Sequence, residues 1–253
     1  MKTTDKEMTF LEHMEELRYR IIICLIAIAI GVIIGFPFSR YALRILKLPG
    51  YPVINKLVFF SPQEGFLIYL RISFFIGLIF SLPVIIYQLF AFIEPALEER
   101  TKKYVLSFIF LGTISFLSGV VFVYFILLPT ALKFLLSFGS SELEPVISAN
   151  KYISFVIMLL IAGGIVFQMP VLSFLLTKLG LINWKFLKEK SNYAVVIIFV
   201  VAALITPTVD IFNLLILALP MIFLYGISIL VSFIAHPKVE VFYYEQNKTL
   251  QNI

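Results

Sequence analysis

The sequence predicts an all-α polytopic membrane protein with six transmembrane helices, and composition is the first reason. Of the 253 residues, 61% are hydrophobic and 14% are charged, and the mean hydropathy is +1.03. A soluble domain carries about 25% charged residues, so this chain cannot cover a water-exposed surface with polar groups. Lipid is therefore expected to be the solvent for most of the chain.

The second reason is a series of apolar stretches long enough to cross a hydrocarbon core of roughly 30 Å. The predicted spans are residues 21–38, 66–93, 104–128, 152–177, 191–206 and 211–235. The fifth is the shortest, with about 16 residues or about 24 Å of helix. The last two spans could also be one long broken element, because only four residues separate them. Pro207 stops a helix and Asp210 can cap the next one, which favours a short hairpin.

Prolines and glycines inside the spans predict how the helices pack. Pro83, Pro170 and Pro220 each remove a backbone hydrogen bond and bend a helix. Three bent helices among six predict a kinked, concave bundle. Gly31 and Gly35 have the spacing that allows close helix packing, either within the chain or between subunits.

The Lys and Arg residues outside the spans predict the orientation. Thirteen fall on the side of both termini and six on the opposite side, and positively charged loops tend to stay in the cytoplasm. Both termini are therefore expected in the cytoplasm. The chain then forms a single transmembrane domain, residues 1–253, with a cytoplasmic amphipathic segment, 1–20, and a cytoplasmic tail, 236–253.

The sequence gives little support to other function classes. An enzyme or metal protein needs clustered nucleophiles, bases or ligands, but the chain has one cysteine, Cys24, and two distant histidines, His13 and His236. No catalytic residue, metal site or cofactor is expected. A small-molecule transporter would usually show internal repeats and ionisable groups at depth, and a lipid-surface scaffold would not need the N-terminal glutamates. The net charge of +5 indicates anchoring to anionic lipid headgroups rather than nucleic-acid binding.

A capping box and apolar residues at helical spacing predict an amphipathic helix that leads into the first span. Its charged residues near the membrane surface are Glu15, Glu16, Arg18 and Arg20. One interpretation is local ion pairing, Glu16 with Arg20 and Glu15 with Arg18. The other is a carboxylate patch that receives a cationic peptide at the membrane surface.

Five motifs along the chain carry a family resemblance. They are His13-Met-Glu-Glu-Leu-Arg-Tyr-Arg20, Ser81-Leu-Pro-Val-Ile-Ile-Tyr-Gln-Leu-Phe-Ala-Phe-Ile-Glu-Pro-Ala-Leu97, Phe167-Gln-Met-Pro-Val171, Ile205-Thr-Pro-Thr-Val-Asp210 and Ala218-Leu-Pro-Met221. In order and spacing they resemble the TatC family, the multispanning core of the Sec-independent (twin-arginine) protein translocase. The resemblance covers nearly the whole chain. It implies six spans, two short final helices and cytoplasmic termini.

The resemblance implies a receptor, not an enzyme. TatC proteins bind the twin-arginine signal peptides of folded cargo at the cytoplasmic face. They recruit single-span TatA- and TatB-type partners, and the proton motive force drives transport. The expected location is the cell inner (plasma) membrane, with this chain as a multi-pass homo-oligomer inside a larger complex and with no nucleic acid as partner.

The resemblance also implies residues for signal-peptide binding. Glu16 matches the receptor carboxylate of the N-terminal motif, with Arg18 as its matched neighbour and Glu15 beside it. Phe92 matches a position linked to receptor function, and apolar packing is its alternative role.

The sequence departs from the family pattern at the second receptor carboxylate. That position is Thr101 here. Glu98 and Glu99 lie two or three residues earlier, and either could replace it if the loop is helical. Glu99 is the preferred candidate.

Two further departures concern the spans. Gln168 stands where many members carry Glu, and with Pro170 it is the expected docking site for a partner; a satisfied amide is its alternative role. Gly226 stands where a Glu is common in the last span. In the outer turn, Pro207 and Asp210 are the candidate residues, with helix capping as the simpler role for Asp210.

Overall fold

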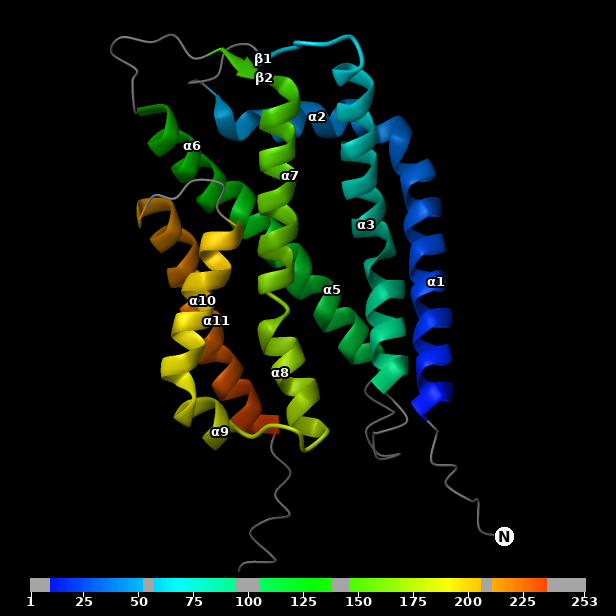
Figure 1. Cartoon of the computed structure of the whole chain (residues 1–253), viewed down its shortest axis with the longest axis vertical. Helices are drawn as coiled ribbons and strands as arrows, with labels where there is room; N and C mark the ends of the chain where they lie inside the picture. Colours follow the sequence, from blue (N-terminus) through cyan, green and yellow to red (C-terminus); the bar gives the residue numbers. More distant parts are fainter. Residues whose placement is uncertain (1–9, 52–56, 94–104, 138–145, 206–210, 236–253) are drawn as a thin grey trace, which may run out of the picture.

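The computed structural model describes residues 10–51, 57–93, 105–137, 146–205 and 211–235, and these are almost entirely helical (Figure 1). The helices are α1 (Phe10–Gly35), η1 (Phe36–Phe38), α2 (Ser39–Lys47), η2 (Leu48–Gly50), α3 (Glu64–Ile93), α5 (Val105–Phe122), the π-helical turn η4 (Val123–Leu127), α6 (Leu128–Ser137), α7 (Ala149–Val166), α8 (Met169–Lys178), α9 (Trp184–Glu189), α10 (Ser191–Ile205) and α11 (Ile211–Ala235).

Five helical segments are long and apolar enough to cross a membrane, and α10 is a shorter apolar helix. The long segments are Glu12–Gly50, Glu64–Ile93, Val105–Ser137, Ala149–Lys178 and Leu214–Ala235. The first residues of α1, the last turn of α3, helix α9 and the end of α11 lie at one end of the bundle, and α2 crosses the opposite end (Figure 1).

The last helix corrects one expectation. Helix α11 has 25 residues, whereas α10 has 15. The prediction of two short final helices is therefore wrong for α11, and only α10 is short. Pro220 lies inside α11 without ending it. A proline can be accommodated in this way because neighbouring helices satisfy the backbone group that it frees.

A pair of two-residue strands adds a feature that the sequence does not predict. Strand β1 (Leu57–Val58) pairs in parallel with β2 (Ile147–Ser148) at the end of the bundle where α2 lies (Figure 1). Four residues are too few to show the alternating pattern by which a strand is detected. The pair joins the segment before α3 to the segment before α7.

Helices α1 and α3 make the most extensive contact between helices, and glycines allow it. A Cβ atom on Gly31 would lie 2.6 Å from the carbonyl oxygen of Gly77, and a Cβ on Gly77 would lie 2.6 Å from the backbone nitrogen of Val32. A Cβ atom on Gly35 would lie 2.8 Å from the side chain of Ile76. Gly31 and Gly35 therefore pack within the chain, as one of the two interpretations of their spacing expected.

Helices α8 and α11 are joined by buried hydroxyl groups. Ser173 donates to the carbonyl of Ser228 at 3.1 Å, and the hydroxyls of Thr177 and Ser232 are 2.8 Å apart. All four residues are buried. In an apolar environment hydroxyl groups need such partners, so these pairs fix α8 against α11.

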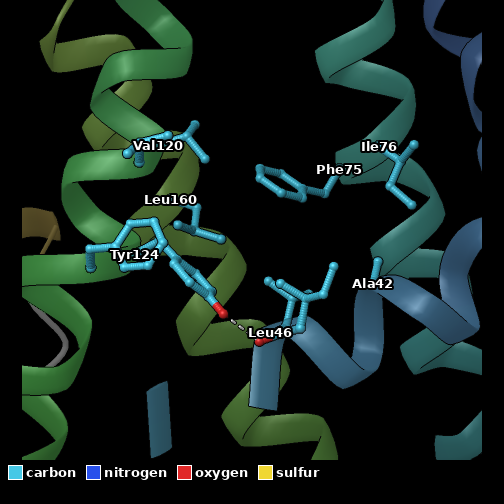
Figure 2. Close-up of a pocket in the computed structure, with 10 residues that line it drawn as sticks. Ala42, Leu46, Phe75, Ile76, Val120, Tyr124 and Leu160 are labelled. Atoms are coloured by element: carbon cyan, nitrogen blue, oxygen red, sulfur yellow. Dashed lines mark hydrogen bonds between the residues drawn. The ribbon is translucent and has the colours of Figure 1, made fainter. Parts of the chain in front are cut away.

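An apolar groove of about 320 Å³ lies against α2, between α3, α5 and α7 (Figure 2). Phe75, Val120 and Leu160 line it. Tyr124, in the π-helical turn, donates from its hydroxyl to the carbonyl of Ile45 in α2 at 2.8 Å. This hydrogen bond links the π-helical turn beside the groove to α2.

The glycine contact between α1 and α3 leads to a stability prediction. Gly77→Ala should destabilise the protein by about 1–3 kcal/mol, because the added methyl group overlaps backbone atoms of α1 that cannot move aside. The measurement is the thermal unfolding midpoint in detergent.

Gly226→Ala is the matched control, because a Cβ there meets nothing within 4 Å and alanine favours helix. If the two variants unfold at the same temperature, the close approach of α1 and α3 is not a constraint on the fold.

Candidate functional site

The antiparallel packing of α1 on α3 brings polar residues together near one end of the bundle. His13, Glu16 and Arg20 lie three and four residues apart, so they share one face of α1. Gln88 and Phe92 are four residues apart on α3 and face them. We call these five residues the Glu16 cluster.

Arg20 holds one oxygen of the Glu16 carboxylate. Its Nε donates to Oε1 of Glu16 at 3.0 Å, and one terminal nitrogen, Nη2, contacts the same oxygen. The other terminal nitrogen, Nη1, donates to Oε1 of Gln88 at 3.1 Å. The predicted ion pair between Glu16 and Arg20 is thus confirmed, and Gln88 anchors it to α3.

The second oxygen of the Glu16 carboxylate, Oε2, accepts no hydrogen bond from Arg20. Oε2 is buried and has no hydrogen-bond partner among the described residues. Nδ1 of His13 lies 3.8 Å from Oε2. The His13 ring stacks on Phe92, with centroids 4.3 Å apart and planes inclined by 21°. A carboxylate oxygen without a donor has acceptor capacity that a cationic ligand could use.

The other predicted receptor residues are placed differently. Glu15 and Arg18 are exposed, and within the described part of the chain no ion pair joins them. The interpretation of local ion pairing is therefore confirmed for Glu16 with Arg20 and wrong for Glu15 with Arg18. Glu98, Glu99 and Thr101, the candidates for the second receptor carboxylate, lie outside the described residues. The same holds for Pro207 and Asp210.

Gln168 lies at the interruption between α7 and α8, directly before the α8 residues Met169 and Pro170. Its side-chain nitrogen Nε2 donates to the carbonyl of Gly112 in α5 at 3.0 Å. Ser115 of α5 donates to the carbonyl of Phe167 at the same interruption. The amide nitrogen is thus satisfied by a neighbouring helix, as the alternative interpretation of Gln168 expected.

Sequence reasoning missed the roles of His13 and Gln88 in the Glu16 cluster. Both residues lie within the quoted motifs, and the i, i+4 spacing of Gln88 and Phe92 shows that they share a helix face. What the sequence does not contain is the register of α1 against α3. That register follows from the contact of Gly31 with Gly77.

Comparisons with known proteins agree with this architecture. Residues 12–220 match the family model described as "Sec-independent protein translocase protein (TatC)". Proteins named "Sec-independent protein translocase protein TatC" are similar over most of both chains. The protein from Carboxydothermus hydrogenoformans is 39% identical over 234 residues, covering 92% of this chain and 96% of that protein. The protein from Aquifex aeolicus is 42% identical over 236 residues, covering 91% and 97%.

Two solved structures are similar as well. A crystal structure described as "Twin Arginine Translocase Receptor- TatC" superposes with a TM-score of 0.78 at 41% identity, covering 88% of this chain and 99% of that chain. A second, of the same receptor in DDM, gives 0.79 at 42% identity, covering 87% and 99%. The all-helical, multi-pass membrane fold predicted from composition is confirmed, and the chain belongs to the TatC family.

Proposed function

We propose that this chain is the receptor subunit of a twin-arginine translocase, which binds the twin-arginine signal peptides of folded cargo. The observation that carries the proposal is the Glu16 carboxylate, held at one end of the bundle with Oε2 unpartnered. Arginine guanidinium groups prefer carboxylates, because a planar fork of N–H donors fits two oxygen lone pairs. A lysine satisfies the charge but not the fork, which explains a preference for arginine.

The second arginine of the signal peptide needs a second carboxylate. Glu99 is our candidate, since it lies in the loop that follows α3, and the C-terminal part of α3 carries Gln88 and Phe92 of the Glu16 cluster. Glu15 and Arg18 lie one and two residues from Glu16 on α1, where they add charge selectivity at the rim.

We propose that the end of the bundle that carries the Glu16 cluster faces the cytoplasm. Lys178 ends α8, and Lys185, Lys188 and Lys190 lie in α9 or directly after it. The end of α8 and helix α9 are at the same end of the bundle (Figure 1), and such basic residues favour a cytoplasmic location. In this orientation the six apolar segments form one transmembrane domain in the cell inner membrane, with residues 1–20 and 236–253 in the cytoplasm.

We propose Gln168 and Pro170 as the docking point for single-span TatA- or TatB-type partners. Pro170 lacks a backbone N–H, so the carbonyl four residues earlier loses its helical partner. Gln168, whose side-chain nitrogen is bound to α5, lies two residues before Pro170. A glutamine cannot titrate, so protonation at this position is not an obligatory step in transport driven by the proton motive force. Pro207 and Asp210 set the outer turn, and several copies of the chain assemble in the active complex.

The central prediction concerns Glu16. Glu16→Gln should weaken binding of a twin-arginine peptide by about 10- to 100-fold, the factor expected when a charged hydrogen bond is lost. Export of a folded twin-arginine reporter should stop, while the protein remains inserted in the membrane.

Glu15→Gln is the matched comparison, because it removes an exposed rim carboxylate one residue away, and it should weaken binding less than Glu16→Gln does. Normal export by the Glu16→Gln protein would remove Glu16 from the receptor site.

The loop after α3 gives a second prediction. Glu99→Gln should reduce cross-linking of a signal peptide to this protein more than Thr101→Ala does, because only Glu99 offers a charged acceptor. Yields are compared at equal amounts of inserted protein. The reverse ranking would show that the second carboxylate has not moved to Glu99.

The interruption between α7 and α8 gives a third prediction. Gln168→Leu should lower the recovery of a TatA-type partner with the purified protein, since leucine has no amide oxygen for the partner. The change in stability should be small, because a hydrogen bond between membrane helices contributes on the order of 0.6 kcal/mol. Recovery equal to wild type would leave Gln168 with its structural role only.

A further inference from the structure

The starting observation is that the Glu16 oxygen without a donor among the described residues lies next to a partly exposed side chain. Oε2 is buried, yet the His13 side chain next to it is 45% exposed. The planar His13 ring stacks on Phe92, and its Nδ1 lies 3.8 Å from Oε2. This distance is too long for a hydrogen bond, so the ring lies beside the oxygen without satisfying it.

The place of the His13 ring has the features that a guanidinium group requires. A guanidinium is planar, stacks on aromatic faces and donates in its own plane to a carboxylate. Phe92 offers such a face. Oε2 of Glu16, which lies 3.8 Å from the His13 ring stacked on that face, offers the acceptor. His13 therefore occupies the position of a ligand arginine with weaker complementarity.

We propose that His13 is a displaceable lid on the Glu16 cluster, and that the signal-peptide arginine docks by taking its place on Phe92 and bonding to Oε2 of Glu16. The inference rests on the proposed receptor function and adds the binding geometry of one arginine. Glu16 and Phe92 contact the ligand, whereas His13 competes with it for the same position.

Arg20 and Gln88 are positioning residues in this arrangement. Arg20 directs two donors to Oε1 alone, and Gln88 holds the third side of its guanidinium. The carboxylate is thereby fixed with Oε2 3.8 Å from the His13 ring nitrogen, and Arg20 leaves this oxygen available to a ligand. The ligand adds to the ion pair of Glu16 with Arg20 and does not have to break it.

The direct test observes the His13 ring by NMR in the full-length protein in detergent micelles. His236→Asn leaves His13 as the only histidine, so histidine-selective isotope labelling reports one ring. The probes are two synthetic signal peptides, one with two consecutive arginines and one with lysines in their place. The arginine peptide should move the His13 ring protons downfield as the ring leaves the Phe92 face, and the lysine peptide at equal concentration should move them less.

Affinity measurements on variants provide the second test. His13→Ala should tighten binding of the arginine peptide by about two- to tenfold, the factor that corresponds to one stacked ring pair. Phe92→Leu should weaken binding and reduce the preference for arginine over lysine, and Phe92→Tyr should restore both. Met14→Ala, at an exposed neighbouring position, should leave the affinity unchanged.

The outcomes separate this inference from the proposed function. Binding that needs Glu16 but leaves the His13 resonances unmoved, with His13→Ala no tighter than wild type, would overturn the lid and keep the receptor. Wild-type protein that binds neither peptide would overturn both.

Discussion

The contact between Gly31 and Gly77 is the constraint on which the polar end of the bundle depends. Two backbones that approach so closely have one register, because a shift along the helix would place a larger side chain in the contact. From that point the antiparallel pair carries Arg20 to Gln88 and His13 to Phe92. A packing contact in the apolar region thus determines the geometry of an ionic cluster near one end of the two helices.

Two kinds of hydrogen bond satisfy the polar side chains inside this apolar protein. Hydroxyl groups such as those of Ser73 and Thr113 donate to the preceding turn of their own helix. Others donate to a backbone carbonyl of another helix, as Gln168 does to Gly112, Ser173 to Ser228 and Tyr225 to Leu187 of α9. Each bond of the second kind links two helices at a defined depth, because the alternative in lipid is an unsatisfied group. In the Glu16 cluster, by contrast, a buried carboxylate oxygen has no donor among the described residues.

The sequence predicts the membrane fold well, because hydropathy and charge act locally along the chain. It also predicts the ion pair of Glu16 with Arg20, since helical spacing alone brings the two residues together. It does not predict Gln88 as the anchor of Arg20 or His13 as the cover of Glu16, because both depend on the register between α1 and α3. The sequence also does not predict the pairing of Leu57–Val58 with Ile147–Ser148. The two strands lie about 90 residues apart, and each is too short to show an alternating pattern of apolar and polar residues.

The lengths of α10 and α11 have a consequence for the surrounding lipid. The 15 residues of α10 measure about 22 Å, and the 25 residues of α11 about 37 Å, against acyl chains that fill roughly 30 Å. The bilayer beside α10 must become thinner, whereas α11 must tilt or thicken the bilayer around it. Each adjustment costs fractions of a kcal/mol per Å of mismatch. Two neighbouring helices therefore place opposite demands on the thickness of the bilayer at this flank of the protein.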